Sequence, residues 1–150
     1  GLASGKNRLF AAFSWWTEKR SLNANSYFHV LVDKIAKTMN LGADEVKTKM
    51  VLEYGTVATE GDEQIIVALP QSVDVKDYYP YARWIADFKA KNGRMYSQYL
   101  LYKRTHTLDK SEMARLIDGV VYEAKELGIE TRTPDELAQL IENWEGCPSE

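Results

Sequence analysis

The chain has 150 residues, of which 45% are hydrophobic and 27% are charged, and its formal net charge is −3. These values are typical of one globular domain, and they exclude a wholly disordered chain, a collagen-like fibre and a disulfide-stapled miniprotein. The single cysteine, Cys147, excludes an internal disulfide and a Cys-rich zinc site. Because uninterrupted apolar runs reach only about five residues, we expect no membrane-spanning helix and no membrane partner.

The first residues lack the pattern of a secretory signal peptide, which is a basic region followed by a long apolar stretch. A single free thiol is also typical of a reducing compartment. Both features predict a cytoplasmic protein.

Charge is distributed unevenly along the chain. Residues 83–110 contain seven Lys or Arg against two Asp or Glu, whereas residues 111–150 contain three against ten. Ordinary solvated surfaces produce such runs. The functional interpretation is a basic strip that binds a polyanion, beside helices that are acidic.

Two helices are predicted in the first third of the chain. The first spans residues 22–40, begins with Ser21 or Asn23 as its N-cap, and stops at Asn40-Leu41-Gly42. The second spans residues 43–54 and ends at Gly55, which we expect in the left-handed conformation. The short loop between them predicts a helical hairpin. The apolar faces are Phe28, Leu31, Val32, Ile35 and Met39 on the first helix, and Val46, Met50 and Tyr54 on the second.

The middle of the chain predicts strands. A β-branched run at 64–69 follows the turn at 60–63 and stops at Pro70, and residues 71–80 read as a loop. A hairpin from 83 to 104 turns at Asn92-Gly93, and its second strand covers residues 95–104. The apolar pattern of residues 81–88 fits neither a helix nor a strand cleanly.

Two further helices close the chain. The first spans 110–128 after a capping box of Asp109 and Glu112, and the second spans 134–144 after a capping box of Thr133 and Glu136. Their apolar faces comprise Met113, Leu116, Ile117, Val120, Val121, Ala124 and Leu127, then Leu137, Leu140, Ile141 and Trp144. The sequence therefore predicts a single α+β domain, with a helical hairpin and C-terminal helices packed on a small, mostly antiparallel sheet.

Catalytic and cofactor motifs are weak in this sequence. His29 and His106 have no ligand partners at the short spacings of known metal motifs, so we interpret both as structural. Phosphate-binding loops and nucleophile elbows are absent, and we expect no cofactor, no metal and no catalytic residue. Two carboxylate groups keep a metal-dependent DNA nuclease open as an alternative, namely Glu60, Asp62 and Glu63, and Asp109, Glu112 and Asp118.

Aromatic and basic residues alternate within residues 78–106, as in surfaces that bind single-stranded nucleic acid. In a strand, Tyr96 and Tyr102 would share one face and Tyr99 the other, so some of these rings must pack in the core. A second candidate is Lys19 and Arg20, because they precede a helix N-terminus, where phosphate is favoured. The candidate DNA-binding residues are Lys19, Arg20, Ser21, Asn25, Lys89, Lys91, Arg94, Tyr99, Lys103 and Arg104.

The segment Lys19-Arg20-Ser21-Leu22-Asn23-Ala24-Asn25-Ser26-Tyr27-Phe28 resembles the R-S-x-x-x-N-x-x-x-aromatic signature of phage NinB/Orf-like recombination proteins. The stretch from Glu112 to Thr131 and Thr133-Pro-Asp-Glu-Leu-Ala resembles the C-terminal half of such proteins. By position, the signature falls on Arg20, Ser21 and Asn25, with Phe28 as its aromatic anchor. Similar proteins have a longer β-rich segment before this signature, so we expect the N-terminal part of this domain to be truncated.

The resemblance implies an α+β homodimer that binds single-stranded DNA in a bacterial host cell and assists recombinase loading without catalysis. The partners that the resemblance implies are host or phage recombination and replication proteins. A second alternative is a phage protein–protein module whose acidic C-terminal helices act on a host replication, recombination or defence protein.

Overall fold

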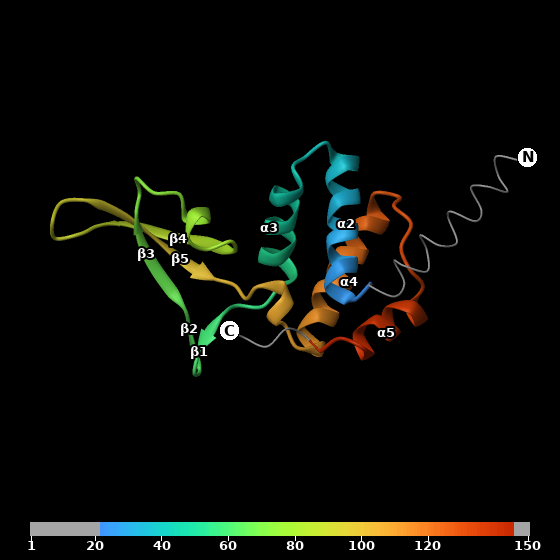
Figure 1. The fold of residues 1–150 in the computed structure, drawn as a ribbon. Coiled ribbons are helices and arrows are strands. Elements are labelled where there is room, and N and C mark those ends of the chain that lie inside the picture. The colour runs from blue at the N-terminus through green and yellow to red at the C-terminus, as the bar shows by residue number, and fades with distance from the viewer. Residues whose placement is uncertain (1–21, 146–150) are drawn as a thin grey trace, which may run out of the picture.

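The computed structural model describes residues 22–145, and it confirms the α+β class (Figure 1). Within these residues the helices are α2 (Ala24–Met39), α3 (Ala43–Tyr54), α4 (Lys110–Glu126) and α5 (Pro134–Glu142). The strands are β1 (Thr59–Glu60), β2 (Glu63–Gln64), β3 (Ile66–Pro70), β4 (Ala82–Lys89) and β5 (Met95–Leu101). Two single 3₁₀ turns are η1 (Val75–Asp77) and η2 (Thr105–Thr107).

The helices bury their apolar faces mainly against one another. α2 packs on both α3 and α4, and α5 packs on α4 and α2 (Figure 1). Their fully buried side chains include Phe28, Leu31, Ile35, Met113, Leu116 and Ile117. Met39 and Leu127, which the helical spacing assigned to the core, are instead exposed, because they stand at the ends of α2 and α4 where no neighbouring helix covers them.

The helix ends follow the capping residues of the sequence closely. The Asn23 side chain accepts a 2.8 Å hydrogen bond from the Ser26 N–H, so Asn23 is the N-cap, and Ser21 lies outside the described residues. Asn40 adopts the left-handed conformation at φ 57°, and both predicted capping boxes form. The prediction for Gly55 was wrong. Its φ is −81°, because its N–H continues the helix to the Val51 carbonyl and the chain then leaves in an extended conformation.

β5 is the central strand of an antiparallel three-stranded sheet with the order β3-β5-β4. The ambiguous residues 81–88 form most of β4, and the predicted second strand of the hairpin ends at Leu101 rather than 104. The predicted strand over 64–69 is divided between β2 and β3. The sheet extends away from the helices on the side of α3 (Figure 1). Both of its broad faces contain exposed apolar side chains.

A small junction joins the sheet to the helices. Tyr81, directly before β4, is buried in the helical core, and its carbonyl accepts a 2.9 Å hydrogen bond from the Tyr102 N–H. The Lys103 N–H donates to the Thr56 carbonyl. Arg83 Nη2 donates to the Leu52 carbonyl, one of the last carbonyls of α3, which helix geometry leaves without an intrahelical donor. The orientation of the sheet therefore depends on few residues.

Gly119 of α4 allows close packing of α3. A Cβ at this position would overlap the Tyr54 ring, whose hydroxyl donates a 2.8 Å hydrogen bond to Glu123 Oε1. Burial, and secondarily this bond to Glu123, raises the pKa of Tyr54 to about 12. The Tyr54 ring is thus held against Gly119 from both ends of the side chain.

We expect Gly119→Ala to destabilise the fold by about 1–3 kcal/mol, because the added methyl group forces Tyr54 away from α4. Chemical denaturation measures this change. In a Tyr54→Ala background the clash is absent, so the same substitution should stabilise α4 by about 0.5–1 kcal/mol through helix propensity. An equal destabilisation in both backgrounds would contradict the packing role of Gly119.

Candidate nucleic-acid interface

A surface pocket of about 230 Å³ lies where the segments before β4 and after β5 meet α2 and α3. Two of the predicted DNA-binding residues, Asn25 and Arg104, line the same pocket although 78 residues separate them in the chain. The first turn of α2, α3, the segment before β4 and the η2 turn contribute to its wall. The lining residues are Asn25, His29, Lys47, Pro80, Tyr81, Arg104, Thr105 and His106.

The pocket lining has a positive balance, because each of these described residues is neutral or basic. Lys47 Nζ lies 5.8 Å from the centre of the Tyr81 ring, within reach of a cation–π interaction. His29 Nδ1 lies 2.8 Å from the Asn25 carbonyl oxygen. A carbonyl only accepts, so this nitrogen carries the hydrogen. Such an arrangement favours an anionic ligand.

The pocket residues that the sequence did not nominate include the two histidines and Lys47. The sequence interprets His29 and His106 as structural, because no ligand partner lies near either in the chain. The structure places both beside one pocket, from α2 and η2, and does not test that interpretation. Two local features of the sequence could have indicated that the histidines share this pocket with nominated residues. Asn25 and His29 have the i, i+4 spacing of one helix face, and His106 lies two residues after Arg104.

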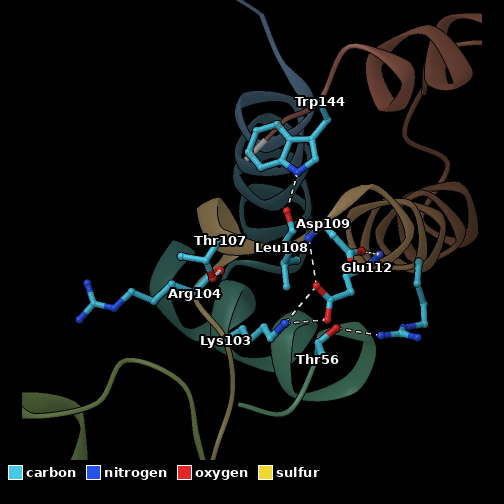
Figure 2. A network of polar contacts seen from close by, with 9 residues as sticks. Thr56, Lys103, Arg104, Thr107, Leu108, Asp109, Glu112 and Trp144 are labelled. Carbon is cyan, nitrogen blue, oxygen red and sulfur yellow. Dashed lines mark hydrogen bonds and ion pairs between the residues drawn. The ribbon is translucent and has the colours of Figure 1, made fainter. Parts of the chain in front are cut away.

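Lys103 and Arg104 differ sharply although they are adjacent (Figure 2). Lys103 Nζ donates to both Glu112 carboxylate oxygens, at 3.0 and 3.2 Å. Glu112 also accepts from the Asp109 N–H in the capping box, so this carboxylate is fixed. The Arg104 side chain extends away from the network, as Figure 2 shows, and it lines the pocket. Arg104 is therefore the better candidate for a phosphate contact.

Three other nominated cations lie at the opposite end of the β4–β5 hairpin. Lys89 ends β4, while Lys91 and Arg94 flank the turn, and all three are exposed. β5 separates them from the pocket, and its seven residues span about 20 Å at about 3.4 Å per residue. The basic residues of the strip thus form two groups, one at each end of β5.

Tyr99 lies on the face of the sheet that also contains an acidic residue. Its Cα partners are Val67 of β3 and Trp84 of β4. On this face Asp87 Oδ1 accepts from Ser97 Oγ at 2.5 Å and from Trp84 Nε1 at 2.8 Å. These bonds, that from Ser97 first, lower the pKa of Asp87 and keep its negative charge in place. The Tyr99 face is therefore less suited to a polyanion.

The opposite face contains a stacked aromatic pair. The Phe88 and Tyr96 rings lie 5.7 Å apart with an interplanar angle of 21°, and Phe88 is 38% exposed. By register and alternation, the strand residues on this face are Arg83, Ala86, Phe88, Tyr96, Gln98, Leu100, Ile66, Ala68 and Pro70, with no carboxylate among them. We call this surface the aromatic face.

Other candidates are not placed at these surfaces. Lys19, Arg20 and Ser21 lie outside the described residues. Within residues 22–145, no three His, Cys, Asp or Glu side chains are grouped so that they could hold a metal ion, and Asp109 and Glu112 serve the capping box. No helix in the same range is long and apolar enough to cross a membrane.

The comparisons with known proteins give no family for this chain. No protein-family model matches it, no curated protein matches it, and no solved structure matches it. The fold and the surface together define an α+β protein with a helical body, a projecting sheet and a basic pocket between them.

We expect Arg104→Met to lower affinity for single-stranded DNA far more than Lys103→Met, although both remove one positive charge. Loss of one phosphate contact should reduce the slope of log affinity against log salt by about 0.7. Lys103→Met should instead cost up to about 1 kcal/mol of stability by removing a partly exposed ion pair. Fluorescence anisotropy and thermal unfolding of both variants test this, and equal losses of affinity would contradict it.

Proposed function

We propose that this chain is a phage-type recombination accessory protein that binds single-stranded DNA and assists recombinase loading without catalysis of its own. The observation that carries the proposal is the aromatic face, because Phe88 is exposed beside the basic hairpin turn and stacks on the half-buried Tyr96. Unpaired bases stack on such rings regardless of sequence, while Lys and Arg follow the phosphate backbone. Duplex DNA hides its base faces and gains nothing from this stacking.

The arrangement of charge agrees with this proposal. Basic residues lie at both ends of β5, with Lys89, Lys91 and Arg94 at one end and Arg104 at the other. A single DNA strand bound along the sheet would therefore meet positive charge at both ends. The helices after residue 110 are acidic, so they would repel DNA from the surface of the helical body. The recombinase and the homodimer come from the resemblance to NinB/Orf-like proteins, and light scattering of the purified chain tests the dimer.

Fluorescence anisotropy with labelled single-stranded and duplex oligonucleotides, at low and moderate salt, tests the proposed binding. We expect tight, salt-sensitive binding that prefers single strands. Lys91→Gln together with Arg94→Gln should reduce the salt slope by about 1.4, which corresponds to two phosphate contacts on a single strand. An absence of binding at low salt would contradict the proposal.

Phe88→Ala should weaken single-strand binding by about 1–3 kcal/mol, the value of one base stacked on an aromatic ring. Tyr122→Ala removes an exposed ring from α4 and should leave affinity unchanged. Trp84→Ala alters the opposite face of the sheet. Its effect on affinity, compared with that of Phe88→Ala, identifies which face of the sheet contacts the single-stranded DNA. A larger loss for Trp84→Ala than for Phe88→Ala would assign binding to the Tyr99 face instead.

A protein–protein module is the second candidate, and exposed apolar side chains on the sheet favour it. Ile66, Ile85 and Met95 are each more than 40% exposed. Ile66 lies on the aromatic face and Met95 on the Tyr99 face, so each face of the sheet offers an exposed apolar side chain that a protein partner could cover. A stable complex with a host recombination or replication protein, without affinity for oligonucleotides, would support this candidate over the first.

A further inference from the structure

A groove of about 390 Å³ lies between the start of α2 and α5. Leu22 and Leu140 give it an apolar lining, whereas Asp135, Gln139 and Asn143 add oxygens that accept hydrogen bonds. Its volume lies within the ~300–1,000 Å³ of ordinary binding pockets. An apolar lining beside acceptors suits a large aromatic ring that also donates a hydrogen bond, as the tryptophan indole does.

The helix α5, which forms one side of this groove, is incompletely covered. None of its residues is buried, and its apolar side chains Leu137, Leu140 and Ile141 are only half-buried against the helical core. Trp144, just after α5, is buried, and its Nε1 donates a 2.8 Å hydrogen bond to the Leu108 carbonyl (Figure 2). α5 is therefore fixed beyond its C-terminal end, while its apolar side chains keep surface that a further segment can cover.

The chain itself brings an apolar segment to this groove. Leu22 lines the groove and is the first described residue, so the residues before it start from the groove wall. Residues 9–16 read Leu-Phe-Ala-Ala-Phe-Ser-Trp-Trp, with five large apolar side chains among eight residues. Trp16 stands six residues before Leu22, a distance of up to about 20 Å of extended chain. The nine residues of α5 rise about 13.5 Å, so this segment can reach the whole groove.

The charge of this segment matches the groove as well. The residues before Leu22 contain four Lys or Arg against one Glu. In the groove, Arg132 pairs with Glu136 at 3.1 Å, and Asp135 has no ion pair among the described residues. Arg20 stands only two residues before Leu22, so its backbone lies within about 7 Å of that residue's backbone. A basic segment thus approaches a groove that carries an unpaired carboxylate.

We propose that residues 9–16 dock in this groove along α5, with the Trp15 and Trp16 rings against its apolar lining and an indole N–H donated to an acceptor of α5. The basic residues that follow, Lys19 and Arg20, then lie beside the acidic first turn of α5. The sequence nominated these two cations for DNA binding, whereas the docking uses them to hold the segment on α5. The inference involves no nucleic acid and does not rest on the proposed function.

Hydrogen exchange of the full chain, followed by mass spectrometry, tests the docking. Trp15→Ser with Trp16→Ser should accelerate exchange across α5 by about tenfold or more, because the helix loses large apolar cover. Trp84→Ser with Tyr122→Ser is the matched control, since it removes two exposed rings elsewhere and should leave α5 unchanged. Exchange in residues 31–36 of α2 should stay slow in both variants, which checks that the core remains folded. Unchanged exchange of α5 in the first variant would overturn the proposal.

A nitroxide label on α5 tests the proximity directly, without altering either tryptophan of the segment. It is attached after Gln139→Cys in a Cys147→Ser background of the full chain. The indole N–H signals of Trp15 and Trp16 should broaden in the NMR spectrum. The Trp84 signal should not, because β4 and α5 lie on opposite sides of the helical body (Figure 1). Sharp signals from Trp15 and Trp16 would overturn the proposal.

A mixed sample separates docking within one chain from docking between two copies. Isotope-labelled chains without the nitroxide are mixed with unlabelled chains that carry it. Sharp indole signals in this mixture, together with broadened signals when one chain carries both labels, support docking of the segment on its own α5. Broadening in the mixture would assign the groove to the segment of a second copy and overturn docking within the chain.

Discussion

The junction around Tyr81 is the constraint on which the rest of this structure depends. The helices bury their apolar faces against one another and not against the sheet. The position of the sheet therefore depends on the buried Tyr81, on backbone hydrogen bonds at Tyr102 and Lys103, and on the Arg83 bond to the end of α3. The pocket adjoins this junction, because Tyr81 is one of its lining residues. A change at the junction would therefore move the sheet and dismantle the pocket together, although the helical core could remain folded.

The helices could be predicted from sequence because their signals are local. Apolar spacing and capping boxes act within a few residues, and both capping boxes and most of the predicted apolar faces appear where the pattern indicated, with Met39 and Leu127 as the exceptions. The sheet was harder, because β4 is exposed along most of its length and carries a bulge near Ile85 that interrupts its alternation. A strand without one buried face does not show a clear alternation of apolar and polar residues.

The candidate site could be predicted only in part. The sequence nominated Asn25 and Arg104 for separate reasons, but their shared pocket depends on packing between segments far apart in the chain. The sequence could not reveal that Glu112 forms an ion pair with Lys103. Glu112 is also the glutamate of a capping box, and the sequence pattern indicates only that role. Tyr96 and Tyr99 were correctly separated by strand alternation, but which face lies beside a carboxylate depends on the pairing of β4.

The sheet has few buried residues, and this affects how tightly it can bind a ligand. Among the described residues of β3, β4 and β5, only Ser97 and Leu101 are buried, whereas α2 and α4 are buried along whole faces. Segments with few buried contacts open locally at a lower free energy than the core does. A ligand on the sheet would have to suppress that motion as it binds, so part of its binding energy is spent on ordering. Affinity would then reflect the rigidity of the hairpin as well as the contacts it makes, and substitutions that only stiffen the hairpin would tighten binding without touching the ligand.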